Sequence, residues 1–132
     1  MEALHDNRIL SYEVDASQHR IVLRTRSEVG DTVDVAFDGV QGYLFERDTL
    51  GSVIYSLDEM PIEAWLEANA TQLDDGRSDA WPGPWNESLD SVRSYLESRQ
   101  SRVFVISSSY GLRGWVLASE CRTEKSGGNV AV

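Results

Sequence analysis

The first half of the chain alternates apolar and polar residues with a period of two, which is typical of half-buried β-strands. Four such segments, separated by polar or glycine-containing turns, occur at residues 10–14, 21–25, 33–45 and 53–57. The first two predict an antiparallel hairpin. Gly39 interrupts the third segment, which indicates one long strand that bends or bulges at this glycine.

At Pro61 the apolar period changes from that of a strand to that of a helix. Apolar residues then fall on one helical face up to Leu73, so the pattern predicts a short amphipathic helix. A second apolar stripe predicts another helix over residues 86–100, which Asn86 or Ser88 can cap. Between the two helices, the sequence WPGPW at residues 81–85 excludes both a helix and a central strand.

The most strongly patterned stretch is RVFVISSSYGLRGWVLASE, at residues 102–120. Residues 103–106 are four consecutive apolar side chains, which predicts a central strand that is covered on both faces. A tight reversal follows, because Gly111 and Gly114 can supply a positive φ. In the next strand Trp115 and Leu117 form a ridge, and the opposite face is small enough for close packing by a helix.

Together these segments predict an α+β fold. The expected sheet has six strands and is mainly antiparallel, with two helices packed on one face and inserted between strands four and five. Residues 1–122 are expected to form a single domain. Residues 123–132 are expected to form a disordered tail, because the segment after Glu120 contains Gly127-Gly128 and little that can be buried.

Composition supports one folded domain and constrains its partners. The chain has 132 residues, of which 41% are hydrophobic, and four of them are tryptophan. The formal net charge is −10, from 22 acidic and 12 basic residues. This charge repels phosphate backbones and anionic membranes, so we expect no nucleic-acid or membrane partner and favour a basic protein. A generic acidic surface with no dedicated partner is the simpler alternative.

The single cysteine and the amino terminus bear on location. Cys121 has no second cysteine with which to form an intramolecular disulfide, which suits a reducing compartment. The first ten residues lack an apolar run of signal-peptide length, and no later stretch approaches the length of a membrane span. We therefore expect a cytoplasmic protein.

The sequence offers no pattern for catalysis, metal binding or cofactor binding. Ser107, Ser108 and Ser109 lack the G-x-S-x-G spacing of a nucleophile elbow, and they are expected to satisfy backbone groups in the turn. His5 and His19 lie near the terminus and in a predicted turn, where neither is held as a base. No metal-ligand spacing or phosphate loop occurs. We assign no catalytic residue, metal or cofactor, and a non-catalytic protein is favoured.

Trp81 and Trp85, in the loop 81–85, are the best candidates for a functional role. Tryptophans in loops either close a core or anchor a partner, and core closure is favoured because a small domain needs it. Three carboxylates directly precede the loop, and they support the interpretation that the tryptophans anchor a charged partner. Asp74, Asp75 and Asp79 would surround the tryptophans and attract a basic protein.

The alternative function is a small-molecule binding or enzymatic domain. Its pocket would lie under the loop 81–85, with Tyr110, Arg113 and Trp115 as polar and aromatic walls. An enclosed cavity lined by these residues would favour this alternative.

Several segments resemble a family of small, single-domain bacterial proteins of unknown function. They are YEVD at 12–15, IVLRT at 21–25, FDGVQGYLFE at 37–46, WPGPW at 81–85 and SSSYGLRGWVLA at 107–118. The resemblance covers most of the chain up to Cys121, and it implies no activity and no catalytic residue. Small acidic bacterial domains of similar build include immunity proteins paired with toxins, which is an analogy of class. We expect a protein-interaction domain.

Overall fold

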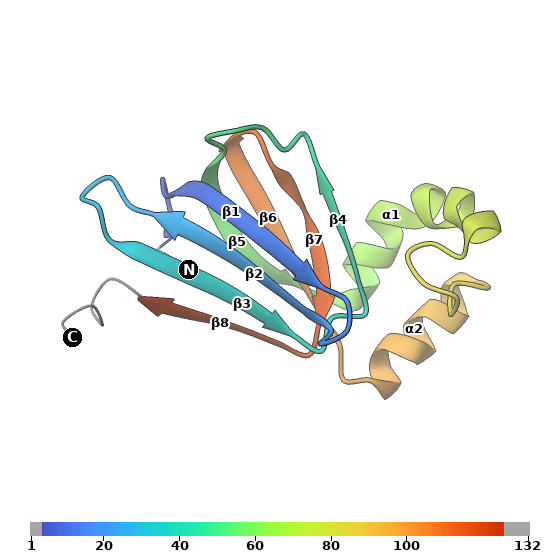
Figure 1. Cartoon of the computed structure of the whole chain (residues 1–132). Coiled ribbons are helices and arrows are strands. Elements are labelled where there is room, and N and C mark those ends of the chain that lie inside the picture. Colours follow the sequence, from blue (N-terminus) through green and yellow to red (C-terminus); the bar gives the residue numbers. More distant parts are fainter. Residues whose placement is uncertain (1–3, 126–132) are drawn as a thin grey trace.

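The computed structural model describes residues 4–125 (Figure 1). Its strands are β1 (Arg8–Asp15), β2 (Arg20–Arg26), β3 (Thr32–Asp38), β4 (Gly42–Glu46), β5 (Val53–Met60), β6 (Arg102–Tyr110), β7 (Arg113–Ala118) and β8 (Glu120–Lys125). Its helices are α1 (Ile62–Gly76), the 3-10 helix η2 (Arg77–Asp79) and α2 (Leu89–Ser98). Within these residues the strands form one sheet in the order β4-β7-β6-β5-β1-β2-β3-β8, and all neighbouring pairs are antiparallel. The predicted α+β class, with two α-helices and an antiparallel sheet, is confirmed.

The sheet folds over into two layers that face each other. One layer contains β1, β2, β3 and β8, and the other contains β4, β7, β6 and β5 (Figure 1). The layers join where β1 meets β5, at the single residue pair Arg8 and Val53. Backbone bonds from Ile9 N to Ser52 O (2.7 Å) and from Ile54 N to Asn7 O (2.9 Å) complete this junction. Beyond the junction the two strands diverge.

The main hydrophobic core fills the space between the two layers. Phe37 of β3 meets Phe104 of β6 across this space, with ring centroids 5.8 Å apart. Both layers contribute buried residues to the core, namely Leu4, Ile9, Ile21, Leu23, Val33, Val35, Phe37, Val40, Ile54, Leu57, Phe104, Ile106, Leu112, Val116 and Ala118. The alternation seen in the sequence therefore marks residues that point inward from two facing sheets.

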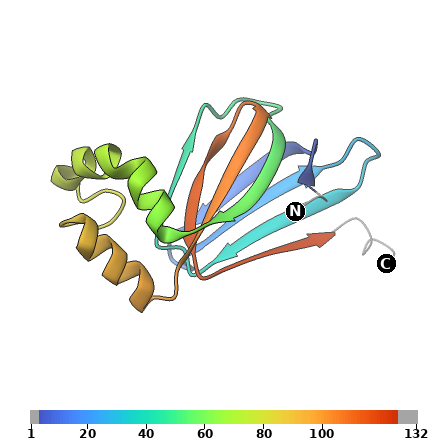
Figure 2. The same cartoon turned by 180° about the vertical axis from the view of Figure 1, so that it is seen from behind.

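A second core lies on the outer face of β6 and β7, under the two helices (Figure 2). Trp65 of α1 packs edge to face on Trp115 of β7, with ring centroids 5.0 Å apart. No helix of the described residues is long and apolar enough to cross a membrane.

Strand β6 is central and covered on both faces, as its four consecutive apolar residues predicted. Phe104 and Ile106 belong to the inner core, and Val103 belongs to the helix core. The expectation for β7 was wrong, however. The helices pack on its Trp115 and Leu117 face, because those large side chains fill the space beneath them.

The prediction of six strands was wrong because residues 33–45 form two strands. The chain turns at Gly39, whose φ is +65°, and leaves the first layer for the second. A β-carbon at Gly39 would overlap the Ser119 hydroxyl, so glycine suits this crossing by both its φ and its lack of a side chain. With β3 and β4 separate and β8 added, the sheet has eight strands. The helices consequently lie between the fifth and sixth strands, not between the fourth and fifth.

The expectation that the chain frays after Glu120 was also wrong for the described residues. Residues 120–125 form β8, which pairs with β3. Arg122 forms an ion pair with Asp38 (2.5 Å), and Lys125 forms one with Asp31 (3.4 Å). Strand pairing needs backbone hydrogen bonds more than apolar side chains, so polar composition did not prevent it. The rest of the predicted tail, residues 126–132, lies outside the described residues.

The turn between β6 and β7 reverses the chain as predicted. Gly111 has a φ of +89°, and a β-carbon there would also overlap the Ser52 hydroxyl. Gly114 serves another purpose, since its φ lies outside the positive region. A β-carbon on Gly114 would overlap the carbonyl oxygen of Leu44, so this glycine lets β4 approach β7.

We predict that Gly114→Ala destabilises the protein by about 3 kcal/mol, because the added methyl group meets the backbone of a neighbouring strand. The control is Gly30→Ala, at a turn glycine with a φ of +97° and open space around it. Backbone strain alone should cost this control about 1 kcal/mol. Urea denaturation measures both values, and equal losses would contradict the role given to Gly114.

We predict that Cys121 reacts slowly with iodoacetamide in the folded protein. The thiol packs against the inner core, and burial raises its pKa to about 11. At pH 8 the thiolate population is then roughly a hundredth of that of an ordinary cysteine. Mass spectrometry follows alkylation, with protein unfolded in guanidinium as the fast control. Equal rates for the folded and the unfolded protein would contradict the burial of this thiol.

The same pKa shift affects stability. Because the unfolded thiol ionises at a lower pH than the folded one, the free energy of unfolding should fall as the pH rises from about 8.5 towards 11.

Candidate functional site

Two strand edges that pair with no other strand of residues 4–125 face the same opening in the structure. Beyond its junction with β5, β1 pairs only with β2 among these residues. Strand β4 ends the sheet order and pairs only with β7 among the described strands. Tyr12 of β1 contacts Phe45 of β4 edge to face, with ring centroids 5.1 Å apart. We call the opening between these strands the β1–β4 cleft.

The β1 wall of the cleft consists of inner-face side chains that the core leaves uncovered. Tyr12 and Val14 lie opposite Leu23 and Ile21 of β2, which are buried. Directly opposed residues share a face of the sheet, yet Tyr12 is 38% exposed and Val14 39% exposed. A bulge at Leu10 shifts the alternation after the buried Ile9 and turns these two side chains inward.

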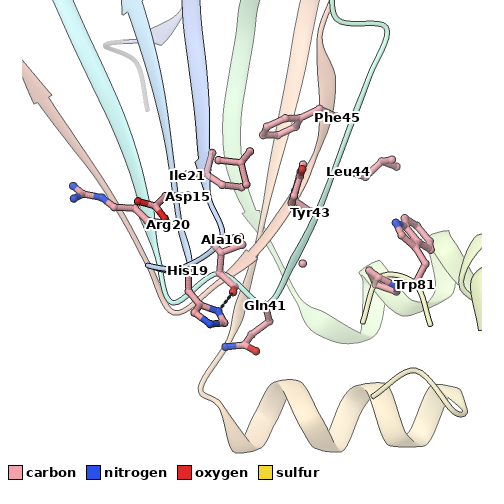
Figure 3. Close-up of a pocket in the computed structure, with 14 residues that line it drawn as sticks. Asp15, Ala16, His19, Arg20, Ile21, Gln41, Tyr43, Leu44, Phe45 and Trp81 are labelled. Carbon is pink, nitrogen blue, oxygen red and sulfur yellow. Dashed lines mark hydrogen bonds between the residues drawn. The ribbon is translucent and has the colours of Figure 1, made fainter. Parts of the chain in front are cut away.

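The β4 wall is aromatic. Tyr43 and Phe45 lie opposite Val116 and Gly114, and Leu44 lies opposite Trp115, so Leu44 points to the other side of the strand. Figure 3 shows Phe45 and Tyr43 on the side of Ile21. Tyr43 is 39% exposed. The cleft encloses about 520 Å³ and is lined by Val14, Asp15, Ala16, His19, Arg20, Ile21, Val40, Gln41, Gly42, Tyr43, Leu44, Phe45, Trp81 and Pro82.

Hydrogen bonds fix both ends of the cleft. At one end, the Tyr12 hydroxyl donates to the Asp48 carboxylate at 2.7 Å. This bond, together with burial and the negative charge of Asp48, raises the pKa of Tyr12, so the hydroxyl keeps its proton at neutral pH. At the other end, Val40 N donates to His19 O (2.8 Å), and Nδ1 of His19 lies 3.1 Å from Val40 O (Figure 3).

Asp15 and Arg20 are register partners at the same end of the cleft, and Figure 3 shows both side chains pointing away from Tyr43 and Phe45. The Asp15 carboxylate accepts hydrogen bonds from the Ser17 hydroxyl (2.8 Å) and the Gln18 amide (3.1 Å). These bonds hold the pKa of Asp15 below its usual range, so it is ionised at neutral pH. The adjacent Arg20 forms its ion pair with Asp38, at 3.4 Å.

The two tryptophans of the loop 81–85 pack against the helix core. Trp85 stacks on Tyr95 of α2, with ring centroids 5.0 Å apart and planes 6° from parallel. Trp81 contacts Trp115, with centroids 5.8 Å apart. Both tryptophans are half-buried, and Trp81 also lines the cleft (Figure 3). The loop therefore closes the helix core, and one of its tryptophans reaches the candidate site.

The other residues proposed from the sequence are spread over three places. Asp74 and Asp75 lie at the end of α1 and Asp79 lies in η2; all three are exposed and outside the cleft lining. Asp74 forms an ion pair with Arg77.

The three residues predicted to line one pocket also lie in different places. Arg113 and the buried Trp115 line a second cleft beside Trp65, and Tyr110 lines neither cleft. The predicted wall of Tyr110, Arg113 and Trp115 under the loop 81–85 does not form.

Catalytic groupings are not evident in the part of the chain that the structure describes. No three His, Cys, Asp or Glu side chains there are placed to hold a metal ion. The Ser108 hydroxyl donates to the backbone oxygen of Leu112, which is the turn role expected for these serines.

Sequence analysis did not single out Val14, Tyr43 and Phe45. The sequence did contain a feature that could have pointed to Tyr43 and Phe45. Residues 40–45 are apolar at both odd and even positions except at Gln41 and Gly42. Residues 33–45 were predicted to form one strand, so the sequence did not reveal that residues 42–46 form a separate strand at the edge of the sheet.

Comparisons of the chain with protein-family models, with curated proteins and with solved structures found no match. The features of the molecule that bear on its function are therefore the geometry of the β1–β4 cleft and the charge of the chain.

We predict that Asn86→Ala lowers the free energy of unfolding by about 2 kcal/mol. The buried Asn86 side chain donates to the backbone oxygens of Leu73 and Trp81, both at 2.8 Å, and accepts from Arg77 at 3.3 Å. It thereby holds the loop 81–85 against α1. Asn69→Ala, which removes one half-buried bond to Trp65 O (2.9 Å), is the control and should cost less. A larger loss for the control in chemical denaturation would contradict this assignment.

Proposed function

We propose that this protein is a protein-interaction domain that binds its partner in the β1–β4 cleft. The observation that carries the proposal is the exposure of Val14 and Tyr43 between two strand edges that lack a partner. Exposed aromatic side chains in a concave site are typical anchors of protein partners. We assign the anchor to Tyr43 instead of Trp85, because Trp85 is stacked on Tyr95.

The opposite end of the sheet supports this assignment by contrast. Strand β8 is also an edge, but its sequence ECRTEK contains four charged residues. Natural proteins use charged edge strands to prevent pairing with other chains. Strand β4 carries Tyr43, Leu44 and Phe45 in its centre and only one charged residue, Glu46. The edge beside the cleft is therefore the one suited to a partner.

The partner in this proposal is a basic protein. The chain carries a net charge of −10, from 22 acidic and 12 basic residues. Asp74, Asp75 and Asp79 add to the negative field from the helix side, where they can raise the association rate without contacting the partner. The same field disfavours nucleic acid as a partner, and the lone Cys121 is compatible with the cytoplasmic location we propose.

A small ligand is the second candidate, because about 520 Å³ lies within the usual range of ligand pockets. The cleft is bounded by strand edges, whose backbone groups suit a polypeptide better than a compact ligand.

We predict that benzoylphenylalanine incorporated at position 43 cross-links a basic protein in lysate of the native host. The same photoreactive residue at position 55 is the control, because Tyr55 is an exposed tyrosine on β5 outside the cleft lining (58% exposed). Mass spectrometry identifies the product. A cross-link at position 55 alone, or at neither position, would overturn the proposed site.

A second set of variants separates attraction from contact. Changing Asp74, Asp75 and Asp79 together to asparagine should slow association severalfold and leave dissociation unchanged, because exposed charges mainly steer encounter. Tyr43→Arg should raise the dissociation rate instead. Surface plasmon resonance with the captured partner gives both rates, and an unchanged dissociation rate for Tyr43→Arg would remove the cleft from the proposal.

A further inference from the structure

We propose that the occupant of the β1–β4 cleft is an extended segment of the partner, which adds to the free edge of β4 as a further strand. The segment is apolar in its centre and carries lysine or arginine in its flanks, because the net charge of this chain is −10. This inference depends on the proposed function and specifies how the partner is bound.

The backbone of β4 supplies the first part of the argument. One edge of β4 pairs with β7 from Gly42 to Glu46, and the other edge has no strand partner within residues 4–125. The edge of a strand presents backbone N–H and C=O groups in a row that a second chain can match. An extended peptide that adds to such an edge gains affinity from backbone hydrogen bonds.

The side chains on the two sides of β4 supply the second part. The cleft lining reaches around the free edge of the strand: Val14 and Tyr43 lie on the inner side, and Leu44 and Trp81 lie on the outer side (Figure 3). Successive side chains of an added strand point alternately to these two sides. Both alternations of the segment therefore meet apolar surface, which selects an apolar centre.

The ends of the cleft limit the length of the segment. Strand β4 has five residues, which corresponds to about 17 Å of extended chain. Tyr12 lies at one end, through its contacts with Phe45 and Asp48. Ala16, His19 and Gln41 line the other end. A segment of about five paired residues matches this length.

A second copy of this chain fits the cleft less well than a basic segment. Each copy carries a net charge of −10, so two copies repel each other. Charge complementarity therefore favours a basic partner over self-association.

The first experiment selects ligands from a phage-displayed library of random twelve-residue peptides. Selection uses the wild-type protein, and counter-selection uses the Tyr43→Arg variant, whose thermal unfolding is checked beforehand. We expect enriched peptides with three to five consecutive apolar or β-branched residues beside lysine or arginine. Enrichment of acidic sequences, or of helical 3.6-residue patterns, would overturn the inference.

The second experiment tests backbone pairing with an enriched peptide synthesised in three forms. One form is unmodified, and the other two are N-methylated at alternate residues, on odd or on even positions. An added strand points alternate N–H groups towards β4. One methylated form should therefore bind at least tenfold more weakly, and the other should bind nearly as well as the unmodified peptide. Equal binding of all three forms would overturn strand addition, and this comparison leaves the protein unchanged.

Amide hydrogen exchange gives the location. Amides of β4 should exchange at least tenfold more slowly when the unmodified peptide is bound, and amides of the charged edge strand β8 should not change. Self-association would appear instead as protection of β4 that depends on protein concentration and needs no peptide, which would overturn the inference.

The two proposals can fail separately. A partner that cross-links at position 43 without protecting the β4 amides leaves the proposed function standing and overturns strand addition. A small apolar ligand that occupies the cleft and excludes every peptide overturns both. Failure to enrich any peptide, together with no cross-link at position 43, also overturns both.

Discussion

The β6–β7 pair is packed on both faces, and the rest of the structure depends on this double burial. Its inner face meets the facing layer of the sheet through residues such as Phe104, and its outer face meets α1 and α2 through Trp115. Burial of large apolar side chains on both faces of this strand pair stabilises both cores. The neighbouring strands β4 and β5 also contact both cores, through side chains such as Phe45 and Leu44 of β4.

The two layers of the sheet are joined much less extensively than either layer is joined internally. One residue pair, Arg8 and Val53, connects β1 to β5, and the strands diverge beyond it. Gly39 then carries the chain across to β4, which pairs only with β7 among the described strands. An open side between β1 and β4 is the direct geometric consequence. Complete pairing there would bury the aromatic side chains that now line the cleft.

The two outer edges of the sheet have different chemistry. Charged side chains occupy β8 and form ion pairs with the acidic residues of β3, for example Arg122 with Asp38. Aromatic and aliphatic side chains occupy β4. An apolar edge that pairs with no strand of the described residues favours pairing with another chain, which is consistent with the proposed bound segment. In that proposal the net charge of −10 disfavours a second copy and favours a basic segment.

The sequence by itself determined the α+β class, the positions of both helices and the burial of Val103, Phe104 and Ile106, because each depends on the local period of apolar residues. It also identified Trp81, which lines the cleft. The number of strands, the pairing of β8 and the free edge of β4 depend on backbone contacts between segments far apart in the chain. Gly39 is compatible with a bulge or with a crossing, and only the pairing of β4 with β7 decides between them. The role proposed for Tyr43 likewise depends on the free edge of β4, which pairs with no second strand of the described residues. The local sequence around Tyr43 does not reveal whether a strand has one neighbour or two.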